Sequence, residues 1–166
     1  MIRDFDVSTA IPLIMFLHLK ADLSTEQLAD CEDVLQSFII RRAVLSQETK
    51  EYNKLFLEII VEISNFRGAA VLPKLTKKLL QGKGITRVWP NDETIMKAIL
   101  ESQLYSTMKT PALRLILERL ELSLRGKKSE DEIIVDGLQI EHVMPQNWGE
   151  NWPLNGQIVD EDLGSY

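Results

Sequence analysis

STEQLADCEDVLQSFIIRRAVL, residues 24–45, is the stretch of sequence that decides the fold. Ser24 followed by Gln27 is a capping-box pattern, in which each side chain bonds the backbone N–H of the other residue at the start of a helix. Apolar side chains then recur at steps of three and four, which places them on one face of a helix. They are Leu28, Cys31, Val34, Leu35, Phe38 and Ile39, with Arg42 on the same face. The segment predicts a long amphipathic helix packed against a core.

The segments on either side repeat this periodicity. It predicts helices over about residues 9–20, 50–66, 70–80 and 91–104, and another from Thr110 onward. Prolines stand in the expected first turns of three of these helices, where the missing N–H does no harm. We expect a bundle of about six helices, with the leucine-rich last helix at its centre.

Beyond Gly126 the pattern changes from helical to β. Residues 133–135 are Ile-Ile-Val, Asp136-Gly137 is a strong two-residue hairpin signal, and residues 138–143 alternate. The predicted fold class is therefore mainly α, a helical bundle followed by a short β-hairpin and an irregular C-terminal tail. The predicted domains are a helical domain at 1–127 and a partial second domain at 128–166, made of the hairpin and the tail.

Composition bounds the class of protein. With 166 residues, 45% of them hydrophobic, the chain can bury a substantial core as one domain with a partial second one. Cys31 is the only cysteine, which excludes an intrachain disulfide and a thiolate metal cluster. The apolar run at 10–19 is too short to span a bilayer and lacks the flanks of a signal peptide. We expect a cytoplasmic protein with no membrane partner.

The net charge of −6 conceals two oppositely charged parts. Residues 129–166 hold nine Asp or Glu and no Lys or Arg, so the first 128 residues carry a balance of +3. Residues 63–91 hold no acidic residue, and their basic side chains are candidates for nucleic-acid contacts. The candidates are Lys74, Lys77, Lys78, Lys83 and Arg87. The plainer alternative, the solvated face of a helix and a loop, is the more frequent role of a patch of this size.

Glu141 and His142 form the candidate catalytic pair, at the end of the second predicted strand and just before a proline turn. Histidine has a pKa near operating pH and suits proton abstraction, and a carboxylate suits a magnesium-like ion. Taken alone, a Glu-His pair is more often structural than catalytic.

Four motifs in order resemble one bacterial family. They are FIIRRAVLSQETKEYNKLF at 38–56, RVWPNDETI at 87–95, ALRLILERLE at 112–121 and IEHVMPQNW at 140–148. Together they are similar to the C-terminal half of the family typified by GmrSD, the type IV, modification-dependent restriction systems of phage defence. The resemblance implies a chain truncated at both ends, with the helical region and the start of a His-Me finger (HNH-like) nuclease.

The resemblance also implies roles for the candidate residues. His142 would be the general base and Glu141 would hold a divalent metal, Mg or Mn, in the complete protein, with none expected bound in this fragment. DNA would be the partner of the complete protein. A nucleotide site is expected only in the missing N-terminal domain, and assembly into a homo-oligomer is left open.

The departures from the family pattern concern the second nuclease motif. A Gly-Asn-Leu strand and an Asn- and Lys-bearing helix complete the family's metal site, and residues 149–166 show no counterpart. We expect a fragment of a DNA endonuclease of a restriction system that is inactive alone. The alternative is a non-catalytic helical module for domain linkage, subunit contact or DNA binding.

The remaining expectations concern His18, a pair of arginines and the three tryptophans. His18 lies in an apolar helix and is expected to be a packed core or edge residue. Arg41 and Arg42 are expected to brace carboxylates and helix carbonyls, with a phosphate role as the alternative. The tryptophans are expected to pack loops against the bundle, with base stacking as the alternative: Trp89, Trp148 and Trp152.

Overall fold

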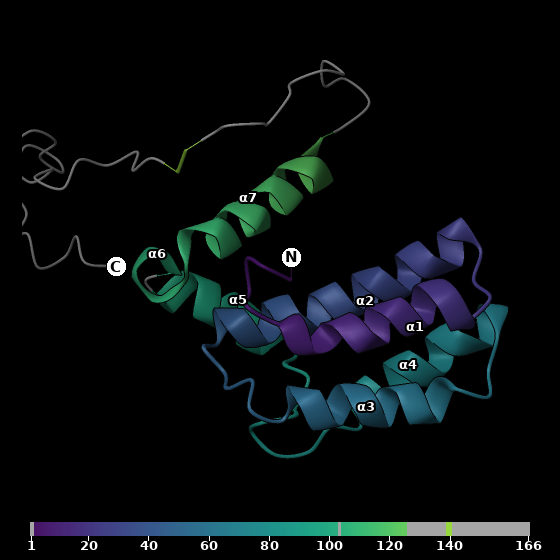
Figure 1. The fold of residues 1–166 in the computed structure, drawn as a ribbon. Coiled ribbons are helices and arrows are strands. Elements are labelled where there is room, and N and C mark those ends of the chain that lie inside the picture. Colours follow the sequence, from purple (N-terminus) through teal and green to yellow (C-terminus); the bar gives the residue numbers. More distant parts are fainter. Residues whose placement is uncertain (1, 103, 126–138, 141–166) are drawn as a thin grey trace, which may run out of the picture. The chain divides into compact units, whose positions relative to one another are not determined.

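The computed structural model describes residues 2–102, 104–125 and 139–140 (Figure 1). The chain divides into two compact units, residues 1–98 and 99–166. Each unit is described by itself. The predicted domain boundary at 127 falls in a range outside the described residues, so it stays a prediction.

The first unit is built from four long helices and the start of a fifth. Its elements are η1 (Ser8–Ala10), α1 (Ile11–Lys20), α2 (Thr25–Val44), α3 (Tyr52–Ile63), η2 (Gly68–Ala70), α4 (Val71–Leu80) and the first part of α5 (Asp92–Glu101). Helix α1 contacts α2 and α3, and α4 contacts the same two helices (Figure 1). The four helices therefore enclose one core, as the stripe on α2 predicted.

The core combines the apolar faces of all four helices. Leu13 and Leu17 come from α1, Leu35 and Phe38 from α2, and these side chains are at most 1% exposed. Helix α3 adds Tyr52, Leu55, Phe56, Ile59 and Ile63, and α4 adds Val71, Leu75 and Leu79. Helix α1 is less buried than its apolar sequence suggested, because Met15 and Leu19 on its outer face are exposed. No helix in the described part of the chain combines the length and the apolar character that crossing a membrane requires.

The predicted helix cap at Ser24 is present, and a second cap lies at Asn91. The Ser24 side chain accepts a hydrogen bond from the Gln27 N–H at 3.2 Å, and the Gln27 side chain accepts one from the Ser24 N–H at 3.1 Å. The Asn91 side chain accepts one from the Thr94 N–H at 2.8 Å at the start of α5. These bonds satisfy N–H groups that would otherwise lack partners in the first turn.

The second unit contains the rest of α5, the short α6 (Leu104–Thr107) and α7 (Thr110–Leu124). Helix α7 buries Ala112 and Leu113 near its start. Its later leucines are at least 44% exposed: Leu117, Leu120, Leu122 and Leu124. The expectation that this helix lies at the centre of the bundle is therefore wrong for the described structure, since a high leucine content does not by itself supply a covering partner.

The predicted fold class needs correction. The described residues contain seven α-helices where about six were predicted, because the single turn of α6 lacks the length that periodicity needs to reveal it. They contain no strand, and the predicted β-hairpin is not present. Gln139 and Ile140 of the predicted second strand are described and lie in no strand, while the rest of that segment lies outside the described residues.

Candidate functional site

The predicted catalytic pair lies outside the described part of the chain. Glu141 and His142 are not among the described residues, so their roles stay a prediction. The described ranges contain no group of three or more His, Cys, Asp or Glu side chains that could hold a metal ion. His18 was expected to be a packed core or edge residue, and it does not lie in the core. Its side chain is 46% exposed, and its Nε2 lies 2.8 Å from a carboxylate oxygen of Glu32.

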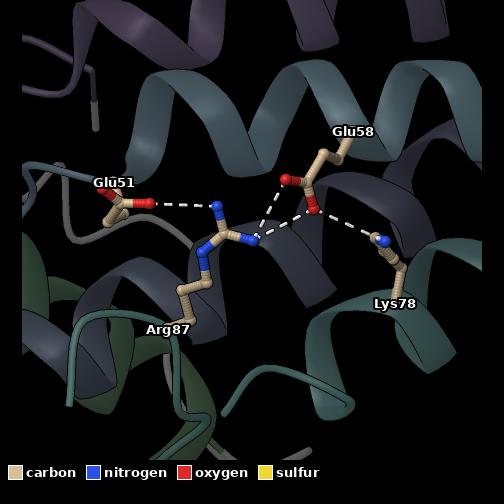
Figure 2. Close-up of polar contacts among 4 residues, drawn as sticks. All are labelled: Glu51, Glu58, Lys78 and Arg87. Carbon is tan, nitrogen blue, oxygen red and sulfur yellow. Dashed lines mark hydrogen bonds and ion pairs between the residues drawn. The ribbon is translucent and has the colours of Figure 1, made fainter. Parts of the chain in front are cut away.

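Two cations of the predicted basic segment instead meet two carboxylates from outside it, in a cluster of four charged side chains (Figure 2). Arg87 Nη1 lies 3.2 and 3.0 Å from the two carboxylate oxygens of Glu58, and Arg87 Nη2 lies 3.0 Å from Glu51 Oε2. Lys78 Nζ lies 3.5 Å from Glu58 Oε2. We call Glu51, Glu58, Lys78 and Arg87 the charge cluster. Two of the candidate DNA-binding cations are thus paired with carboxylates of the same chain.

Local structure explains why these residues meet. Glu51 immediately precedes α3 and Glu58 follows seven residues later, about two helical turns on and therefore on the same face. Lys78 is in the last turn of α4, which packs against α3. Arg87 comes from the connection between α4 and α5, residues 81–91, which we call the α4–α5 loop.

Gly82 allows this loop to fold back on itself. A Cβ at this position would lie 2.1 Å from the carbonyl oxygen and 2.8 Å from the carbonyl carbon of Arg87. Both are backbone atoms, which cannot move aside as the end of a flexible side chain can. Only glycine permits so close an approach, which brings Arg87 back toward α3 and α4.

The ion pairs shift the pKa values of two members of the charge cluster. The hydrogen bond and the charge of Arg87, with a further contribution from Lys78, lower the pKa of Glu58 below its usual 4.5. Hydrogen bonds to Glu58 and Glu51 raise the pKa of Arg87 above its usual value. Both residues are therefore charged at neutral pH.

The remaining predicted DNA-binding lysines differ from one another. Lys74 Nζ lies 4.6 Å from the ring centroid of Phe66, a cation–π contact. Lys77 and Lys83 are exposed, and neither has a hydrogen-bond or ion-pair partner within the described structure. The predicted basic patch thus contains two paired cations, one stacked on a ring and two open to solvent.

A surface hollow of about 290 Å³ lies beside the charge cluster. Its lining includes Glu58, Lys78 and Arg87 from the cluster, together with Lys83 from the α4–α5 loop. Leu55 forms an apolar part of its wall. The hollow is therefore lined by three cationic side chains and one carboxylate.

Arg42 fastens the other side of the α4–α5 loop and is fully buried. Its Nη1 donates to the carbonyl oxygens of Ile85 at 3.2 Å and Val88 at 3.0 Å. Its Nη2 donates to Glu48 O at 2.8 Å and its Nε to the Tyr52 hydroxyl at 3.1 Å. Burial raises the pKa of Tyr52, while Arg42 lowers it in part. Arg42 thus braces loop carbonyls, where helix carbonyls were expected.

Arg41 holds the end of the same loop. Its Nη1 donates to Pro90 O at 3.0 Å, and its Nη2 lies 2.5 Å from a carboxylate oxygen of Asp92. Its guanidinium also lies 6.0 Å from the Trp89 ring, which packs against Phe38 with centroids 5.7 Å apart. Trp89 is thus a packing residue, as expected, while the other two tryptophans lie outside the described residues.

The sequence identified part of this arrangement. Periodicity placed Arg42 on the core side of α2, but no sequence signal identified its partners.

Comparison with known proteins gives one match. Residues 89–164 match the family described as GmrSD restriction endonucleases, C-terminal domain. The matched range contains the motifs at 112–121 and 140–148 and most of the one at 87–95, and the motif at 38–56 lies outside it. No curated protein and no solved structure matches the chain. Residues 89–164 are therefore similar to the C-terminal region of the GmrSD-type restriction endonucleases, and the matched range begins in the α4–α5 loop, which Arg41 and Arg42 hold.

Proposed function

We propose that this chain is part of a metal-dependent DNA endonuclease of a restriction system, with Glu141 and His142 in its cleavage site. The observation that carries the proposal is the family match over residues 89–164, which includes this pair. The description of the matched family names restriction endonucleases, and the phosphodiester bond of DNA is the substrate that this activity implies.

The two side chains suit complementary tasks. The imidazole of His142 would accept a proton from the attacking water, a task that suits histidine because an unperturbed imidazole has a pKa near neutral pH. The carboxylate of Glu141 would contribute an oxygen ligand for a divalent ion such as Mg or Mn. When bound, that ion would supply positive charge at the phosphate oxygens.

We further propose that the 166-residue chain cleaves DNA weakly or not at all by itself. Residues 149–166 contain no His, Lys or Arg and do not match the second motif that the family resemblance implies. A pair of side chains without the remaining groups of the site lacks the fixed geometry on which catalysis depends.

The second candidate function is a non-catalytic helical module that holds DNA. The exposed, unpaired Lys77 and Lys83 beside a cation-lined hollow favour this candidate. The two functions are compatible in one protein, since the hollow belongs to the first compact unit and residues 141–142 to the second.

The two histidines of the chain provide a direct test of the proposed cleavage site. Histidine NMR signals should be followed while Mn²⁺ is added to the whole chain. We expect the His142 signal to broaden at a lower Mn²⁺ concentration than the His18 signal, and Glu141→Gln to remove this difference. His142→Ala and His18→Ala assign the signals. Equal broadening of both signals, or selective broadening that survives Glu141→Gln, would contradict the proposed metal site.

A plasmid cleavage assay tests the proposed inactivity of the chain alone. We expect only background nicking, and robust cleavage would overturn this proposal.

A further inference from the structure

The charge cluster has the composition of a phosphate site that is occupied by a carboxylate of its own chain. The planar guanidinium fork binds carboxylate and phosphate oxygens with the same two-pronged geometry. Here Nη1 of Arg87 is taken by both oxygens of Glu58, and Nη2 is taken by Glu51. Lys78 contributes a second cation to Glu58 at 3.5 Å (Figure 2).

The cluster lies where an external anion can reach it. The side chains of Glu58 and Lys78 are 32% and 29% exposed, and they line the hollow of about 290 Å³. A volume of this size is several times the roughly 30 Å³ that one water occupies in the liquid, so it accommodates a phosphate group. The Arg87–Glu58 and Lys78–Glu58 pairs are partly exposed and lie outside the apolar core, so Glu58 can be exchanged for another anion without disturbing the core.

The surroundings of the hollow carry surplus positive charge. Lys83 lines the hollow, and Lys77 is exposed in the residue before Lys78. Neither lysine has a carboxylate partner among the described residues. An anion that entered the hollow would therefore find cations that the chain itself leaves unneutralised.

We propose that this hollow is a binding site for a backbone phosphate of duplex DNA, and that Glu58 gates it by occupying the phosphate position on Arg87 and Lys78. When DNA binds, the phosphate displaces the Glu58 carboxylate, which turns outward to solvent. Glu51 keeps its contact with Nη2 of Arg87 and holds the guanidinium in place. The internal carboxylate thus lowers the affinity of the basic segment for DNA. The proposal takes its partner, DNA, from the proposed function.

The test compares Glu58→Gln with Glu62→Gln. Both changes remove one negative charge from α3, and Glu62 lies about one turn away, exposed and outside the charge cluster. Binding of a fluorescent duplex to the whole chain should be measured by anisotropy between about 50 and 200 mM salt.

We expect Glu58→Gln to tighten DNA binding by about threefold to tenfold at low salt and to leave the salt slope nearly unchanged, because the same phosphate contact is present in both complexes once Glu58 has turned away. Glu62→Gln should give less than about a twofold change, since it alters only the general field. Lys83→Ala, placed in the Glu58→Gln chain, should reverse part of the gain. Circular dichroism should show the same helical signal for all variants.

Equal effects of the two glutamine variants would overturn the gate and leave only the general field. A salt slope that steepens by about one in Glu58→Gln would overturn the displacement as well, because it would show that the wild-type complex lacks this phosphate contact. Failure of the proposed gate can be distinguished from failure of the proposed cleavage site. The gate is measured by DNA affinity at Glu58, and the cleavage site by Mn²⁺ at His142.

Discussion

Arg42 and Arg87 are two guanidinium groups that hold the same loop from opposite environments. Arg42 is fully buried and donates to three backbone carbonyls and a tyrosine hydroxyl. Arg87 is 19% exposed and donates to two carboxylates. The buried guanidinium is matched by neutral partners fixed in the fold, and the half-buried one by charged partners that solvent and other anions can replace. The first arrangement builds the loop, and the second leaves it able to bind.

The largest effect is expected at the buried group. Arg42→Ala should lower the free energy of unfolding by about 3–5 kcal/mol, because several buried carbonyls lose their donor and a cavity opens beneath Phe38 and Tyr52. Arg42→Lys should not restore it, since an ammonium group cannot span four separated acceptors. Urea unfolding followed by circular dichroism measures the loss.

Arg67→Ala is the matched control for this change. Arg67 also donates to backbone carbonyls, those of Ser64 and Phe66 at 2.7 Å, but it is exposed. Cys31 gives an independent readout, because burial and the neighbouring Asp30 and Glu32 raise its pKa to about 11 and keep the thiol unreactive in the folded protein. Thiol labelling should accelerate in Arg42→Ala and not in Arg67→Ala. Similar losses in the two variants would show that burial of Arg42 does not matter.

An intermediate effect is expected at Gly82. Gly82→Ala should destabilise the protein by about 1–3 kcal/mol, because the new Cβ meets the Arg87 carbonyl and forces the loop away from α3. Gly84→Ala is the control in the same loop: nothing lies within 4 Å of its Cβ, and its φ of +79° alone costs about 1 kcal/mol. Urea midpoints give the two values. A loss at Gly84 that equals or exceeds the loss at Gly82 would contradict the close approach.

The smallest effect on stability is expected when acid protonates Glu58, the partner of Arg87. The pKa of Glu58 is lower in the folded protein than its usual 4.5, so its contribution to stability is present above 4.5 and is lost as pH falls through the lowered value. The difference in urea midpoint between the wild type and Glu58→Gln should therefore shrink between about pH 6 and pH 3. The effect of Arg42→Ala should persist over this range, because its partners are neutral. A midpoint difference at Glu58 that is independent of pH would show that the ion pair contributes nothing.

Local patterns were sufficient for most of the helices. The capping box at Ser24, the cap at Asn91 and the apolar stripe of α2 depend on residues within about two turns of one another, and the structure has all three. The single turn of α6 is too short to show a period, and the exposed leucines of α7 show that apolar content does not determine burial. The hairpin was inferred from a turn dipeptide and β-favouring residues, a signal that is weaker than helical periodicity over many turns.

The sequence predicted which cations belong to the candidate site, but it did not predict which carboxylates pair with them. The absence of acidic residues from 63–91 pointed to a free basic patch, yet Glu58 is 29 positions from Arg87 and Glu51 is 36 positions away. Counting charges along a segment cannot show a carboxylate that another helix supplies. The same holds for Arg42, whose acceptor at Val88 is 46 positions away.

The sequence by itself determined where the chain is helical, which faces of those helices are apolar, and the resemblance to the GmrSD family that the match at 89–164 supports. These features depend on local spacing and on motifs, both of which are written in consecutive residues. Only the tertiary structure decided which cations are buried, which are paired and which stay open to a ligand. That outcome depends on helix packing, because the packing of α3 against α4 is what brings Glu58 to Lys78 and Arg87.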